Sequence, residues 1–257
     1  MRVVCQDGAV TGARHCGDGD RTLVFVHGVG STAAIWDEQL REFGDEYRCF
    51  AVELRGNGTF EDPDPSSITR AGFADDVLAV TAAANVDRFT LIGCSLGGVV
   101  AFELFGRVPQ RFEAMVLAGT FAVYPNAQAY LEGVLAALHE AGSMPAFAQM
   151  RAAKLGLPPE RTRETVEQMA CKSVACYEAS SRATWTGDYR ALLPEIRVPA
   201  LVVCGERDTV APYKLSQEIA MSIPGARLEV IEAAGHVCNA DAPDAFDDVV
   251  GAFLSSC

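Results

Sequence analysis

The chain lacks the features that mark membrane, secreted and zinc-finger proteins. No apolar run approaches the roughly 18 residues that span a bilayer, and residues 1–8 contain no long apolar stretch of the kind found in signal peptides. The nine cysteines include no CxxC pair, which excludes zinc-finger spacing. We therefore expect a cytoplasmic protein with reduced thiols, in which Cys49 and Cys204 behave as small apolar side chains.

Positive charge is also scarce. The 257 residues carry 21 Lys and Arg against 34 Asp and Glu, a net charge of −13. Binding to phosphate backbones or anionic lipid surfaces requires basic patches, so we expect neither nucleic acid nor membrane as a partner. The expected partner is a small-molecule substrate. The oligomeric state is left open, with a homodimer as one option.

What the chain does contain is a series of short apolar runs separated by helix-length segments. Continuous apolar runs of this length are typical of buried parallel strands, and helices between them favour an α/β fold with a mostly parallel central sheet flanked by helices. Two earlier stretches, 1–5 and 9–15, predict a leading antiparallel hairpin. The runs are 22–26, 48–52, 89–93, 114–118, 200–204 and 227–231, and the helical patterns are 32–43, 69–84, 95–107, 212–222 and 242–254.

The alternation stops after Ala118. Residues 126–190 show only helical patterns, near 126–141, 144–154, 159–171 and 173–186. Residues 121–193 hold seven basic and seven acidic side chains, so the remainder carries the whole negative charge. We interpret 121–193 as an all-helical lid inserted after the sixth strand of a core formed by 1–120 and 194–257. Alternatively, the acidity follows the solvated faces of the outer helices.

A nucleophile elbow is indicated at Gly93-Cys94-Ser95-Leu96-Gly97. An apolar run precedes this pentapeptide and a helical pattern follows it at once, as in a tight turn that exposes one serine oxygen. A plain glycine-rich helix start and a phosphate loop are the alternatives. No Gly-Lys-Ser/Thr follows, which argues against the phosphate loop.

A serine nucleophile needs a base, and the base needs an orienting acid. Of the four histidines, His236 follows the last predicted strand, where the base belongs in the chain order serine, acid, histidine. Asp208 follows the run 200–204 and is the preferred acid, with Glu206 as the alternative. Residues 119–122, after the preceding strand, contain no carboxylate, which also favours Asp208.

Two backbone N–H groups are candidates for the oxyanion hole. Leu96 directly follows the serine, and Val29 lies in the loop His27-Gly28-Val29-Gly30-Ser31 after the first buried strand. We interpret His27 as a structural residue that supports this loop.

Taken together, these segments resemble the α/β-hydrolase family along essentially the whole chain. Among its lidded members, the pattern is similar to 3-oxoadipate enol-lactonases and related small esterases. The resemblance implies a Ser95–Asp208–His236 triad that needs no metal or organic cofactor. Two positions depart from the family: Glu53 replaces the usual Asp, and Asn57 replaces a residue that is often aromatic or His. The matching blocks are 27–31 with Trp36, 54–58, 93–98, 202–208 and 234–236.

Substrate contacts are less well defined. The candidate pocket residues are aromatic side chains and methionines, for which core packing is the competing interpretation. Cys94 and Cys238 flank the expected nucleophile and base, and packing is favoured over reactivity for both. The candidates are Trp36, Phe121, Tyr124 and Trp185, with Met144, Met150 and Met169.

Three functions are compatible with the residues. The first is hydrolysis of a small ester or lactone, neutral or weakly charged because the chain is acidic. The second keeps the fold but catalyses another reaction, such as carbon–carbon bond hydrolysis, a lyase step or a cyclisation. The third is a ligand-binding receptor or an inactive relative. The sequence argues against haloalkane dehalogenation, because that reaction would need a carboxylate in place of Ser95.

Overall fold

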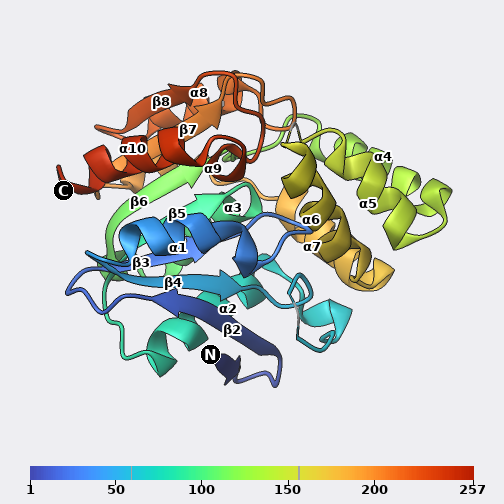
Figure 1. Ribbon diagram of the computed structural model, residues 1–257, viewed down its shortest axis with the longest axis horizontal. Helices are drawn as coiled ribbons and strands as arrows, with labels where there is room; N and C mark the ends of the chain where they lie inside the picture. The colour runs from blue at the N-terminus through green and yellow to red at the C-terminus, as the bar shows by residue number, and fades with distance from the viewer. Residues whose placement is uncertain (59, 156) are drawn as a thin grey trace.

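The computed structural model describes residues 1–58, 60–155 and 157–257 (Figure 1). Its strands are β1 (Arg2–Val4), β2 (Val10–Cys16), β3 (Thr22–Val26), β4 (Arg48–Glu53), β5 (Phe89–Cys94), β6 (Phe112–Ala118), β7 (Ala200–Gly205) and β8 (Arg227–Ile231). They form one sheet in the order β1-β2-β4-β3-β5-β6-β7-β8. β1 and β2 pair antiparallel, β2 is antiparallel to β4, and all other neighbours are parallel. The predicted α/β fold is confirmed.

Helices cover both faces of the sheet. In the part of the chain that the structure describes, none is long and apolar enough to cross a membrane. The helices of the sheet layers are α1 (Asp37–Phe43), α2 (Arg70–Ala83), α3 (Leu96–Arg107), α8 (Tyr213–Ser222), α9 (Cys238–Asp241) and α10 (Pro243–Leu254), with short 3-10 turns at Ala33–Trp36, Pro65–Ser67, Pro109–Arg111 and Leu193–Glu195.

Alternate residues of the central strands enter two separate apolar cores. In β3, Val24 and Val26 pack on the side covered by α2, α3 and α8. Leu23 and Phe25 point the opposite way, against α1 and α10. All five residues of β3 are buried, so both faces of this strand are covered. That burial explains why the sequence of this strand is apolar at every position instead of alternating between apolar and polar residues.

Between β6 and β7 the chain leaves the sheet and forms a helical insertion. Its helices are α4 (Ala127–Ala141), α5 (Met144–Ala152), α6 (Pro159–Ala170) and α7 (Val174–Trp185). These bounds lie close to the four predicted helical patterns. Figure 1 shows the insertion gathered at one end of the sheet, and an antiparallel bridge between Val123 and Asp188 joins its two connecting segments.

The strand register aligns the carboxyl ends of the central strands. Gly93 lies opposite both Val26 of β3 and Leu117 of β6, and Ala118 lies opposite Val203 of β7. Loops that follow these strands therefore meet at one edge of the sheet, which is where ligand sites form in open α/β sheets.

Candidate active site

Ser95 sits in a strained turn between β5 and α3. Its φ of 55° and ψ of −112° lie outside the regions that residues with side chains normally occupy. Two hydrogen bonds hold the turn: the Ser95 N–H donates to the Ala118 carbonyl at 2.9 Å, and the Thr120 hydroxyl donates to the Ser95 carbonyl at 2.7 Å. The strained turn is thus supported by the end of β6, the neighbouring strand, and by the residues that follow it.

The glycines of the elbow permit close backbone approach. A Cβ atom at Gly97 would collide with the Val26 carbonyl oxygen, and one at Gly93 would collide with the Gly97 backbone. A Cβ atom at Gly28 would lie 3.3 Å from the Ser95 Cβ. The loop after β3 therefore passes directly beside the serine, in the position where we expect an oxyanion donor.

Asp208 and His236 form a buried pair. The His236 Nδ1 and Asp208 Oδ2 atoms are 2.8 Å apart, and since a carboxylate accepts, the Nδ1–H donates. The other carboxylate oxygen accepts the N–H groups of Val210 and Ala211, both at 2.8 Å. The Asp208 side chain is fully buried and fixed on both oxygens. This bonding leaves Nε2 of the imidazole available for a different partner.

Gly119 makes room for this pair, a role that sequence reasoning missed. Its φ is 51°, and a Cβ atom there would lie 2.8 Å from the His236 carbonyl oxygen and 3.3 Å from Asp208 Oδ2. Thr120, which binds the Ser95 carbonyl, was missed as well. The one sequence signal for these two residues is their position: they follow the end of the strand that pairs with β5, directly beside the elbow.

His27 lies fully buried beneath the loop 27–31. Its Nδ1 donates to the Gly28 carbonyl at 2.8 Å, and its Nε2 accepts the Leu54 N–H at 3.2 Å. Both ring nitrogens are occupied by backbone groups, so this histidine is a structural support. Burial lowers the pKa of His27 to about 3, which keeps the ring neutral.

The same loop is connected to the insertion by Asn57. Its side-chain oxygen accepts the Gly30 N–H at 3.1 Å, and its amide donates to the Ser180 hydroxyl of α7 at 3.0 Å. The Lys172 ammonium donates to the Asn57 carbonyl. Burial lowers the pKa of Lys172 to about 8, and it raises the pKa of the nearby Glu53 carboxyl to about 6. These contacts tie α7 and its preceding turn to the core.

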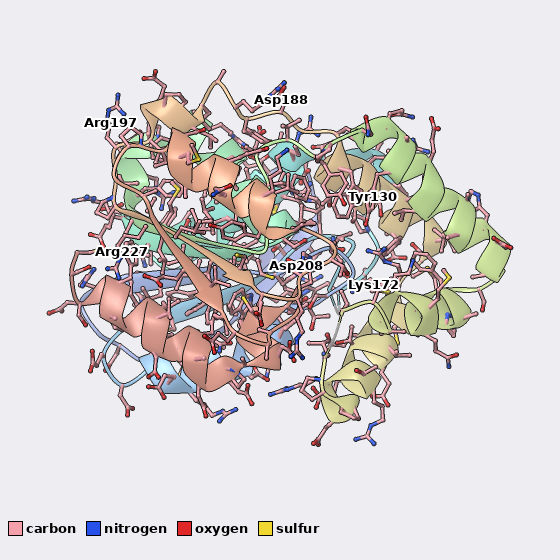
Figure 2. All side chains as sticks on the ribbon, turned by 90° about the horizontal axis from the view of Figure 1, so that it is seen from above. Tyr130, Lys172, Asp188, Arg197, Asp208 and Arg227 are labelled. Atoms are coloured by element: carbon pink, nitrogen blue, oxygen red, sulfur yellow. The ribbon has the colours of Figure 1, made fainter. Side chains whose placement is uncertain are left out.

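One pocket is lined by the loops at the strand ends and by the inner side of the insertion. It has an empty volume of about 620 Å³, part of it open to solvent. Figure 2 shows Tyr130 and Lys172 on the insertion side and Asp208 on the adjacent edge of the core. The lining residues are Gly28, Val29, Gly30, Ser31, Ile35, Cys94, Ser95, Arg151, Leu155, Thr165, Met169, Tyr177, Trp185, Val210, His236 and Val237.

The structure brings some of the predicted site residues together and separates others. Ser95, His236, Val29 and Trp185 line the pocket, and Asp208 contacts it through His236. Leu96 is buried as the first residue of α3. Of the three methionines considered, Met169 is a lining residue. Neither Arg151 nor Tyr177 was foreseen, because helical periodicity does not say which side of a helix faces a pocket.

Three of the aromatic candidates are placed outside the lining of this pocket as the structure describes it. Trp36 is fully buried against Phe25 and Phe246 in the core on the α1 and α10 side. Phe121 stacks on Trp185 with ring centroids 5.2 Å apart, and the Tyr124 hydroxyl donates to the Val210 carbonyl at 2.9 Å. Phe121 and Tyr124 thus lie behind the pocket wall and support Trp185.

The cysteines beside the serine and histidine are buried. Burial raises the pKa of the Cys94 thiol to about 12 and that of Cys238 well above its ordinary value. A thiol is nucleophilic as its thiolate, so both are held in the unreactive form. In the described part of the chain, no group of three or more His, Cys, Asp or Glu side chains is arranged to hold a metal ion.

Comparison with known proteins agrees with this architecture. The family model described as alpha/beta hydrolase fold matches residues 21–243. 3-Oxoadipate enol-lactonase 2 of Acinetobacter baylyi is 30% identical over 246 residues, which cover 93% of this chain and 90% of that protein. RutD of Yersinia enterocolitica, named as a putative carbamate hydrolase, is 25% identical over 244 residues, covering 91% of this chain and 87% of its own.

A solved structure matches over nearly the full length. A hydrolase from Pseudomonas aeruginosa PA01 superimposes with a TM-score of 0.90 at 31% identity, covering 99% of this chain and 97% of that one. A parallel sheet with a serine elbow at its carboxyl edge defines an enzyme fold of the hydrolase class. The chain belongs to the α/β-hydrolase family.

Proposed function

We propose that the protein is a serine hydrolase that cleaves a carboxylic ester or lactone of a small, neutral or weakly charged substrate. The observation that carries this proposal is the 2.8 Å bond between Asp208 and His236 in a pocket that also contains the strained Ser95. The names of two relatives, an enol-lactonase and a carbamate hydrolase, both describe attack on an acyl carbon, which supports the same kind of chemistry here.

In the proposed reaction, Nε2 of His236 takes the hydroxyl proton as Ser95 attacks the substrate carbonyl. Asp208 holds the tautomer with Nδ1 protonated and stabilises the imidazolium. The N–H groups of Val29 and Leu96 bind the oxyanion, and the free N–H at the start of α3 suits that role. His236 then protonates the leaving oxygen, and water attacks the acyl-enzyme by the same route.

We also propose that residues 121–193 act as a lid over the pocket. Arg151, Thr165, Met169, Tyr177 and Trp185 of the insertion all contribute to the lining. A wall that differs in origin from the catalytic loops can change shape without disturbing them, and closure would exclude water from the acyl-enzyme. The lid would therefore set the substrate range.

The proposal is tested with a short 4-nitrophenyl ester. Turnover should fall by at least about 10³-fold in Ser95→Ala and His236→Ala, and strongly in Asp208→Asn, which fixes the wrong tautomer. A fluorophosphonate should label Ser95, as mass spectrometry of the peptide would reveal. Ser222→Ala and His139→Ala change exposed residues of the same types and serve as controls.

Two results would count against it. Turnover that survives both Asp208→Asn and His236→Ala would show that the triad is wrongly assigned. Labelling of Ser95 without turnover of any ester or lactone would instead favour another reaction on the same fold, or a binding role.

A further inference from the structure

Lys172 is a buried cation that the proposed reaction does not use. It lies in the turn between α6 and α7 and is 6% exposed, whereas Lys154 and Lys214 are exposed. Figure 2 shows it where the insertion meets the core. Its ammonium donates to the backbone carbonyl of Asn57, and among charged groups Glu53 stabilises it most. A lysine is seldom buried without such compensation, so this contact requires an explanation.

Glu53, at the end of β4, is the opposite charge in this arrangement. Its Oε1 accepts the Ala33 N–H at 3.2 Å and lies 3.8 Å from Nε2 of His27. Gly58 makes room for the side chain, because a Cβ atom there would collide with Glu53. The Glu53 carboxylate is thus bonded to the loop after β3 and also attracts Lys172 of the insertion.

Asn57 and Glu53 together hold the loop of the candidate oxyanion donor at two points. The Asn57 side chain accepts the Gly30 N–H, directly after Val29, and Glu53 accepts the Ala33 N–H. Lys172 contacts the backbone of the first residue and attracts the carboxylate of the second. A cation carried by the insertion therefore acts on the segment 53–57, from which this loop is held.

We propose that Lys172 is a positioning residue that couples the seating of the insertion to the position of the Val29 N–H. With the turn seated, the ammonium fixes Asn57 and Glu53, and these two fix the loop 28–33. With the turn lifted away, the loop loses that support. Lid closure then completes the oxyanion hole. This inference rests on the proposed hydrolase function and deepens it; Lys172 itself touches no reacting atom.

The charge of Lys172 changes within the pH range of an ester assay. Burial lowers its pKa to about 8, and burial raises that of Glu53 to about 6, so both are ionised between these values. The coupling should be lost as the pH rises through 8 and the ammonium becomes a neutral amine. The other titratable or charged groups that act on the pair are Asp62, Cys171 and Cys176 near Lys172, Arg14 near Glu53, and the neutral His27 beside both.

The kinetic test follows kcat for 4-nitrophenyl butyrate from pH 6.5 to 9.5. Wild type should lose activity above about pH 8. A hydrogen bond to a charged group corresponds to roughly a 10- to 100-fold effect, so Lys172→Met should lower kcat at pH 7.5 by about tenfold or more, change KM less than about threefold, and show no fall near pH 8. Lys172→Arg keeps the charge, so its kcat should be intermediate and also show no fall there. Lys154→Met removes an exposed charge of the insertion and should follow wild type.

Glu53→Gln provides a second variant if Lys172→Met does not fold. It keeps an oxygen for the Ala33 N–H and removes the charge that stabilises the ammonium. The pKa of Lys172 should then be lower, so the fall in kcat should move to lower pH. A fall at the same pH in wild type and Lys172→Met, or one that Glu53→Gln leaves in place, would overturn the inference, because Lys172 would then not be the titrating group.

Hydrogen exchange at pH 7.5 tests the coupling without relying on turnover. In Lys172→Met, peptides covering residues 28–36 and 171–180 should both exchange faster than in wild type, and Lys154→Met should leave them unchanged. Faster exchange in 171–180 alone would refute the coupling, because the insertion would then loosen without the oxyanion loop. Failure of the hydrolase function is detected separately, as the absence of any turnover that depends on Ser95, and the exchange result still decides the coupling.

Discussion

The side-chain oxygen of Asn57 accepts a hydrogen bond from the backbone N–H of Gly30 at 3.1 Å. Gly30 follows Val29, so the bond fixes the loop that would present the Val29 N–H to an oxyanion. Because Asn57 also binds Ser180 of α7, one side chain contacts both this loop and the insertion. The departure from the family pattern at this residue therefore has a structural consequence.

Asn57→Ala should lower kcat for a 4-nitrophenyl ester by about tenfold or more, with a smaller change in KM. The expected cause is a loosened oxyanion loop, since a misplaced donor loses stabilisation of the transition state rather than of the bound substrate. Steady-state kinetics measures the split. Ser180→Ala is the matched variant, because it removes the contact with α7 and keeps the bond to Gly30. If both variants reduce kcat equally, seating of the insertion and not the Gly30 bond controls the loop.

Gly119→Ala should separate Asp208 from His236. The new methyl group would lie within 3.3 Å of the carboxylate and closer still to the His236 carbonyl, at a φ that disfavours any side chain. We expect at least about a tenfold loss of kcat/KM and a loss of about 1–3 kcal/mol in the free energy of unfolding. Activity assays and urea unfolding measure these two effects.

The control for that variant is Gly133→Ala. Gly133 lies on the exposed side of α4, where a Cβ atom would meet no described group within 4 Å beyond its own helix. Alanine should therefore stabilise the helix by roughly 0.5–1 kcal/mol and leave the rate unchanged. A Gly119→Ala protein with normal activity would mean that the Asp208–His236 pair tolerates displacement or does not contribute to the rate.

Much of the fold could be predicted because the central strands β3 to β7 are buried on both faces. A run such as Leu91-Ile92-Gly93 has no polar position, so it is recognised without knowing which neighbour it pairs with. The candidate triad could be predicted for a related reason: Ser95, Asp208 and His236 each follow a parallel strand, and parallel strands end at a common edge. The short helix α9 was not predicted, since four residues are too few to show a period.

The pocket wall could not be predicted in the same way. Trp36 and Trp185 both occur in an apolar setting near helical segments, yet one packs against α10 and the other lines the pocket. The difference depends on how the 3-10 turn Ala33–Trp36 is directed and on how α7 lies over the sheet edge. These are tertiary relationships that no local pattern of residues contains. The pocket position of Arg151 depends on them as well.

Thiol reagents should leave the proposed activity intact. Cys171 and Cys257 are exposed, whereas Cys94 and Cys238 are buried and have raised thiol pKa values because of that burial. Iodoacetamide should reach the exposed Cys171 and Cys257 in the native protein, and the buried Cys94 and Cys238 only after unfolding. Peptide mass spectrometry gives the order of labelling, and parallel ester assays give the rate. Rapid labelling of Cys94 with loss of turnover would mean that this thiol is reactive and accessible from the pocket.

His27 should make the protein sensitive to mild acid. Burial lowers its pKa from the ordinary 6.5 to about 3, so between these values the unfolded chain binds a proton that the folded protein does not. The stability linked to His27 is therefore complete above pH 6.5 and is lost as the pH falls toward 3, by up to about 5 kcal/mol. Glu53 opposes this trend: its pKa is raised by burial from 4.5 to about 6, so its contribution is lost as the pH rises through that range.

Urea unfolding of wild type and His27→Gln between pH 7.5 and 4 separates the two contributions. The variant loses the hydrogen bonds of the ring and should be less stable at pH 7.5, but its stability should fall less steeply with acid, so the two curves converge. His139→Gln changes an exposed histidine of α4 and is the matched control for the substitution itself. Parallel curves for wild type and His27→Gln would show that His27 does not titrate on unfolding, which would contradict its assignment as a neutral structural support of the loop 27–31.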